Sequence, residues 1–181
     1  MSAIRSLKAN VSRSEAEQHF TGGTFSLARM FRDPARSIAD LYIPFRLFQV
    51  KIVTGAREQS HIFGLEAVQG ILDLYEFPAL PGAESVMSLE TRNVLQTRLS
   101  ADQAKEEVLA KVRRLVFSRG FFRLRDLRFE AVEVPGEICI PYWVCFRGDD
   151  GQVRISVLDA VRRRPEGAKV RRLVEQWLQS K

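Results

Sequence analysis

The sequence predicts an α+β protein of two related halves, each a helix followed by an antiparallel meander, packed together into one compact unit. Three observations predict this fold: a strongly periodic helix near the middle of the chain, three strand-like segments after it, and short motifs that recur in both halves. The composition, with 45% hydrophobic and 28% charged residues, is typical of a folded globular chain.

Two helices are indicated by periodicity and by end signals. The first is expected over residues 101 to 118, where Ser100 and Gln103 have the spacing of a capping box and Gly120 ends the last turn. Its apolar stripe consists of Ala104, Val108, Val112 and Leu115. The second is expected from about Pro165, with an apolar face of Val170, Leu173, Val174 and Trp177.

Three strands are expected between these helices. Residues 121 to 134 mix aromatic, β-branched and charged side chains and then meet Pro135-Gly136, which favours a strand entering a turn. Residues 138 to 146 are apolar at both alternating sets of positions, which is typical of a strand covered on both faces. After a hairpin loop at residues 148 to 151, apolar and polar residues alternate from Val153 to Val157.

Recurring motifs relate the first half of the chain to the second. Ile43-Pro44-Phe45 matches Ile140-Pro141-Tyr142, and the segment from Leu65 to Val68 matches that from Leu158 to Val161. Ser12 and Glu15 repeat the capping spacing of Ser100 and Gln103. Because three matches occur in the same order, we interpret the chain as an internal duplication. The predicted repeats are residues 10–76 and 100–179, joined by the breaker-rich connection 77–99.

The end of each repeat resembles the PepSY-type module. Members of that family have an aromatic-rich second strand and a third strand that ends in roughly Asp-Ala-x-Thr-Gly. The first repeat has Glu66-Ala67-Val68-Gln69-Gly70, and the second has Asp159-Ala160-Val161-Arg162-Arg163 without the glycine. The resemblance implies small α+β modules that are non-catalytic and that inhibit or regulate peptidases or bind at cell surfaces.

The search for catalytic chemistry returns no motif. The chain has two histidines without zinc-ligand spacing, no phosphate-binding glycine loop and no nucleophile elbow, so neither a metal nor a cofactor is expected. Glu66 and Asp159 are expected to accept backbone N–H bonds from the turns that follow them. The sequence therefore predicts a non-enzymatic binding or protein-interaction module whose partner is an unidentified protein or peptide.

The alternative function is a basic nucleic-acid or polyanion binder. The formal charge is +6, and cations concentrate in two stretches, residues 111–128 and 162–172. The predicted polyanion-binding residues are Arg162, Arg163, Arg164, Lys169, Arg171 and Arg172. Phe121 and Phe122 lie among arginines, where they could stack on bases. Both stretches also fit solvated helix faces, and a pair of phenylalanines also fits a core.

The remaining expectations concern assembly and compartment. The strand at residues 121–134 is expected to expose a sheet edge, which suits a homodimer or a captured peptide strand. The N-terminal stretch has no apolar segment and the longest wholly apolar run is residues 140–146, so no membrane span and a cytoplasmic location are predicted. Cys139 and Cys145 are about 20 Å apart along one strand, too far to pair, and are expected in the core.

Overall fold

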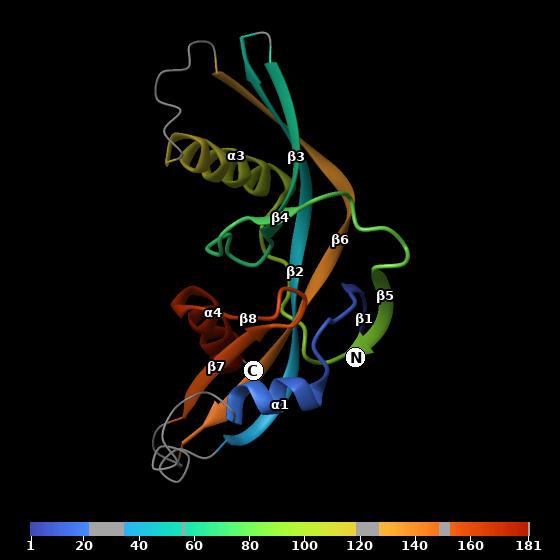
Figure 1. The fold of residues 1–181 in the computed structure, drawn as a ribbon, viewed down its shortest axis with the longest axis vertical. Helices are drawn as coiled ribbons and strands as arrows, with labels where there is room; N and C mark the ends of the chain where they lie inside the picture. Colours follow the sequence, from blue (N-terminus) through green and yellow to red (C-terminus); the bar gives the residue numbers. More distant parts are fainter. Residues whose placement is uncertain (22–34, 56, 119–126, 149–152, 181) are drawn as a thin grey trace. The chain divides into compact units, whose positions relative to one another are not determined.

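The computed structural model describes residues 1–21, 35–55, 57–118, 127–148 and 153–180 (Figure 1). In chain order the elements are β1 (Ser2–Leu7), α1 (Arg13–Thr21), β2 (Ala35–Thr54), β3 (Arg57–Glu66), β4 (Tyr75–Phe77), β5 (Val86–Thr91), α3 (Ala101–Ser118), β6 (Leu127–Arg147), β7 (Arg154–Asp159), β8 (Arg164–Pro165) and α4 (Ala168–Gln179). Strands account for 48% and helices for 26%, so strand structure dominates.

The described strands belong to one eight-stranded sheet. Its order is β4-β3-β2-β6-β1-β5, and β7 and β8 join it through β6. β2 pairs with β3 in antiparallel register, with Thr54 opposite Arg57 at the turn. β6 and β7 pair in the same sense, with Tyr142 opposite Asp159. The antiparallel pairing expected on either side of residues 148–151 is therefore present, although most of the predicted loop lies outside the described residues.

The chain forms two compact units. The first unit comprises Met1–Ile43, Met87–Leu95 and Ile140–Lys181, and the second unit comprises Pro44–Val86 and Gln96–Cys139. The long strands β2 and β6 contribute residues to both units.

In the first unit, α1 packs on strands that come much later in the sequence. Ala16 and Phe20 of α1 are buried in a cluster with Cys145 of β6 and Leu158 of β7. α4 contacts β7 and buries one face made of Val170, Leu173 and Val174. Three of the four residues of the expected apolar stripe are thus buried, whereas Trp177 is only partly buried, and the helix begins at Ala168 rather than Pro165.

In the second unit, α3 packs on strands that come earlier in the sequence, along β3 in Figure 1. The buried α3 residues are Ala104, Val108 and Val112, and their strand partners are Phe48, Val50, Phe63 and Leu65. The predicted bounds of this helix and its capping box are confirmed. The Gln103 amide lies 3.3 Å from Ser100 Oγ, and the Ser100 amide lies 3.0 Å from Gln103 Oε1.

The predicted fold class is wrong in its architecture. Only the broad description α+β fits, because strands dominate, the chain forms two compact units, and the units are not helix-plus-antiparallel-meander halves. α1 packs on β6 and β7, whereas α3 packs on β2 and β3. The periodicity of a helix shows which of its faces is buried, but it does not show which strands receive that face.

The predicted turn at Pro135-Gly136 is also wrong. β6 continues through this dipeptide from Leu127 to Arg147, with Gly136 at a φ of 96°. Glycine adopts this left-handed value without steric cost, and a proline is tolerated within a strand where its missing N–H is not needed. Residues 121–126 of the expected strand lie outside the described part of the chain.

The turns that follow β3 and β7 make corresponding backbone bonds. The Ala67 amide donates to Pro44 O at 2.9 Å, and the Ala160 amide donates to Pro141 O at 3.1 Å. The carbonyl of each alanine then accepts a bond from the segment that precedes a helix. Arg98 N lies 3.0 Å from Ala67 O, and Asn10 N lies 2.8 Å from Ala160 O. Each of these turns therefore holds the start of a helix that is distant in sequence.

Replacing Gly70 by alanine is expected to lower the free energy of unfolding by about 2 kcal/mol. Gly70 has a φ of 69°, and an added Cβ would lie 3.2 Å from Glu107 Cγ and 3.3 Å from Leu99 Cδ1. The matched control is Gly55→Ala, because Gly55 has a φ of 57° with no atom within 4 Å of the added Cβ. Urea denaturation should show a larger loss for Gly70→Ala; equal losses would contradict the tight packing of this turn.

Candidate functional site

The predicted arginine-rich site lies in the first unit, over the turn after β7, the short strand β8 and the start of α4 (Figure 1). Arg163 is in the turn and has a φ of 57°, which a residue with a Cβ rarely adopts. The turn after β3 has Gly70 at the corresponding place. The structure therefore brings the six predicted residues onto consecutive elements of one unit.

Three of the six residues are tied into the fold of the first unit. Arg163 donates from Nη2 to Asn10 O and lies 3.7 Å from Glu15 Oε1. Arg164 Nε lies 3.3 Å from Glu166 Oε1. The Arg162 backbone N–H donates to Asp159 Oδ1 at 2.8 Å. Neighbouring groups of the protein thus partly neutralise the charges of the Arg163 and Arg164 side chains.

The other three residues project from α4. Lys169, Arg171 and Arg172 are all exposed, because the opposite face of the helix is buried. The helix begins after Gly167, which offers no side-chain cap, and its first turn contains no acidic residue. Carboxylates normally occupy the first turn of a helix, where they offset its positive end, and α4 has cations there instead.

In the described part of the other basic stretch, residues 111–118, the cationic side chains contact groups of the protein. The Lys111 side chain is only 12% exposed, and its Nζ donates to Leu72 O at 2.9 Å. Arg114 Nη2 lies 3.3 Å from Glu107 Oε1, and the Arg113 guanidinium lies 5.9 Å from the centre of the Phe129 ring. Phe121, Phe122 and the arginines around them lie outside the described residues.

Two buried carboxylates end the strands β3 and β7, as the sequence predicts. Glu66 Oε1 accepts bonds from the Val68 and Gln69 amides, and Oε2 accepts one from Ile71 N at 3.0 Å. Asp159 Oδ1 accepts bonds from Val161 and Arg162, each at 2.8 Å. Their expected role as acceptors for the following turn is confirmed.

The second oxygen of Asp159 is buried and has no hydrogen-bond partner in the described structure. Burial raises the pKa of this carboxyl group, and the bonds from the Arg162 and Val161 amides oppose the shift only in part. Burial also raises the pKa of Glu166, against the lowering effect of Arg164. Both carboxyl groups next to the arginine-rich segment are therefore easier to protonate than isolated ones.

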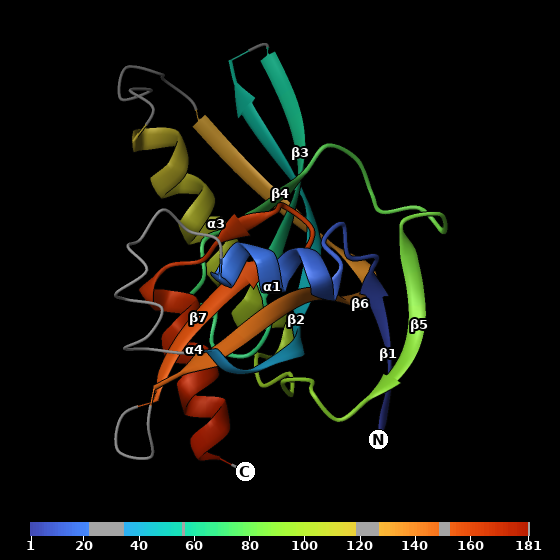
Figure 2. The same cartoon turned by 60° about the horizontal axis from the view of Figure 1, so that its bottom comes forward.

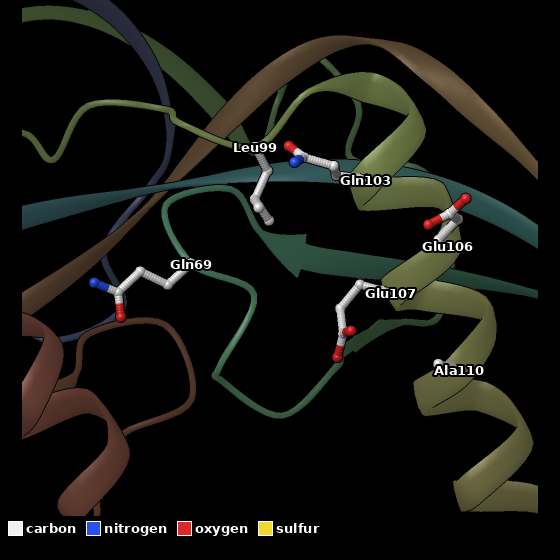
Figure 3. Close-up of a pocket in the computed structure, with 6 residues that line it drawn as sticks. All are labelled: Gln69, Leu99, Gln103, Glu106, Glu107 and Ala110. Carbon is white, nitrogen blue, oxygen red and sulfur yellow. The ribbon is translucent and has the colours of Figure 1, made fainter.

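A depression of about 420 Å³ lies in the second unit, beside the N-terminal part of α3. Its lining residues are Gln69, Leu99, Gln103, Glu106, Glu107 and Ala110 (Figure 3). Figure 3 shows the last four in succession along α3, with Gln69 on the turn that follows β3. The carboxylate of Glu107 lies within 4 Å of Lys111 and Arg114, so intramolecular cations already neutralise it.

Both cysteines are buried in the core, as expected. Burial raises the pKa of the Cys139 thiol to about 12, so it stays protonated at neutral pH. Among the described residues, no three His, Cys, Asp or Glu side chains group closely enough to hold a metal ion. No helix in the described part of the chain is both long and apolar enough to cross a membrane.

The free edge of β5 is a surface that the sequence analysis missed. β5 ends the sheet order and follows β1, so among the described strands it has a neighbour on one side only. Figures 1 and 2 both show β5 beside β1 at the border of the sheet. The sequence signal was weak because its six residues, VMSLET, include only two large apolar side chains.

No protein-family model, no curated protein and no solved structure matches this chain.

Replacing Asp159 by asparagine is expected to be less harmful at neutral pH than in acid. The pKa of Asp159 is raised above its ordinary value of 3.8, so the folded protein loses stability as the pH rises from that value through the folded-state pKa. Asparagine keeps an acceptor oxygen and carries no charge. The free energy of unfolding of Asp159→Asn, expressed as its difference from that of wild type, should therefore become more favourable to the variant as the pH rises from about 3.5 to 7.

Urea denaturation at the two pH values measures this change. Glu90→Gln, at an exposed position of β5, is the control and should show no comparable improvement. If the difference between wild type and Asp159→Asn is the same at both pH values, the inferred rise in pKa is wrong.

Proposed function

We propose that the protein is a non-catalytic interaction module that binds an extended segment of a partner protein along the free edge of β5. The observation that carries this proposal is that the six-residue strand β5 has no neighbour on its outer side among the described strands. Such an edge presents backbone N–H and C=O groups that another extended chain can bond.

β5 is better suited to this role than the short strands β4 and β8. β4 has three residues and β8 has two, too few for a stable pairing with a peptide. β5 contains no proline and only one charged residue, Glu90, so it lacks the usual devices that block an edge. Met87 is 42% exposed and offers an apolar contact to an incoming side chain.

The roles of three buried ionisable groups support a non-catalytic function. Glu66 and Asp159 bind backbone amides, and the Cys139 thiol is buried and protonated. The PepSY resemblance remains a prediction and agrees with this proposal, because modules of that type bind or regulate other proteins. The same edge suits a second copy of the chain, so the test must separate the two occupants.

A selection from a random twelve-residue peptide library should yield peptides that bind the wild-type protein through β5. The double variant Met87→Lys with Ser88→Lys places charges on two exposed edge positions and is expected to weaken binding at least tenfold, because lysines on an edge oppose strand addition. Fluorescence anisotropy of the selected peptides measures the change.

The matched control is Val153→Lys, because Val153 is 56% exposed and lies in the same unit outside β5. It should leave the peptide affinity unchanged. Peptides that bind the double lysine variant as well as wild type would contradict the proposal. A concentration-dependent dimer that the double variant abolishes, without any peptide binding, would assign the edge to a second copy instead.

A further inference from the structure

We propose that the exposed basic surface of α4 and the turn before it binds the phosphodiester backbone of nucleic acid. This basic surface consists of the exposed Arg163, Arg164, Lys169, Arg171 and Arg172, with the half-buried Arg162 at its border. It is separate from the edge of β5, so the two proposals stand or fall independently.

The packing of α4 fixes where its cations point. Val170, Leu173 and Val174 are nearly inaccessible, so the rotation of the helix about its own axis is set by the core of the first unit. Lys169, Arg171 and Arg172 are consequently held in solvent. A partner with several negative groups can meet them without any rearrangement of the fold.

The position of these cations in the helix is unfavourable for stability. Lys169 lies in the first turn and the two arginines follow at once, where the helix dipole and the free N–H groups are positive. The helices α1 and α3 begin differently: Glu15 is in the first turn of α1 and Asp102 is in that of α3. α4 therefore departs from the local rule that places acidic residues in the first turn of a helix, and such departures are typical of binding surfaces.

The carboxylates that face this surface only partly offset its charge. Glu15 lies beside Arg163, Glu166 beside Arg164, and Glu175 is exposed further along α4. Asp159 is buried beneath the turn and binds backbone amides. From Arg162 to Arg172 there are six cationic residues and one acidic residue, so the surface stays strongly positive.

The chemistry of the surface favours a phosphate chain over a lipid membrane. A membrane-surface helix needs an apolar face that enters the lipid, and the apolar face of α4 is already buried against the first unit. Guanidinium groups bind phosphate oxygens with paired hydrogen bonds, and several of them side by side suit a polymer with repeated phosphates. Contacts of this kind position the backbone and carry no base specificity.

The test uses a fluorescein-labelled, mixed-sequence DNA duplex and the triple variant Lys169→Gln, Arg171→Gln, Arg172→Gln. Wild type should bind with micromolar or tighter affinity at low salt. Each lost phosphate contact reduces the slope of log K against log salt by about 0.9, so three lost contacts lower log K by about 2.7 at 0.1 M relative to 1 M salt, and the triple variant should bind roughly 500-fold more weakly there. Anisotropy titrations across a salt series give both quantities.

The matched control is Lys105→Gln, Arg113→Gln, Arg114→Gln, which removes three exposed cations from α3 and changes the net charge equally. It should retain most of the affinity. The triple variant on α4 should also be at least as stable as wild type in urea, because it removes positive charge from a helix start; a purely structural role of these residues would lower stability instead.

If the two triple variants weaken duplex binding equally, binding depends only on the net charge of the protein, and the proposal is overturned. Absence of duplex binding at low salt would overturn it as well. Vesicles that contain anionic lipid, tested at the same salt, form a further arm: binding to vesicles without binding to the duplex would assign the surface to a membrane.

Discussion

The structure depends on two buried carboxylates, Glu66 and Asp159, which end β3 and β7. A buried carboxylate costs free energy unless it is hydrogen-bonded, and each of these accepts at least two backbone N–H bonds from the turn that follows it. The turns are thereby held in one conformation. Without the carboxylates, the same amides would be left near the core with no acceptor.

The alanine after each carboxylate connects the ordered turn to a helix that is distant in sequence. Ala67 accepts bonds from Arg98 and Leu99 ahead of α3, and Ala160 accepts a bond from Asn10 ahead of α1. Side chains add a second tie, because Arg46 Nη2 donates to Leu99 O at 3.3 Å and Trp143 Nε1 donates to Val11 O at 2.9 Å. The start of each helix is therefore fixed by strands from the other half of the chain.

Local features of this design could be predicted from the sequence. The capping boxes, the stripe of α3 and the role of the two carboxylates depend on residues within a few positions of one another. The choice of strands beneath each helix could not be predicted, because Val108 or Ala16 fits any apolar face of suitable shape. β1 and β5 were also missed or only loosely placed, since their pairing relies on backbone groups that every sequence supplies.

The two candidate surfaces also differ in how far the sequence predicts them. The cations of α4 were visible in the sequence, and the structure adds that the core holds Lys169, Arg171 and Arg172 outward while acidic neighbours engage Arg163 and Arg164. The edge of β5 was not visible, because a free edge is a property of the whole sheet order.

Native-state hydrogen exchange of the Arg98 and Asn10 amides tests the central account most directly. Both amides lie outside helices and strands, yet the account predicts that each opens with the same free energy as a core strand amide of its own unit, such as Phe48 for Arg98 and Leu158 for Asn10. If Arg98 and Asn10 exchange through local openings while the strands stay protected, the turns do not hold the helices, and the account is wrong.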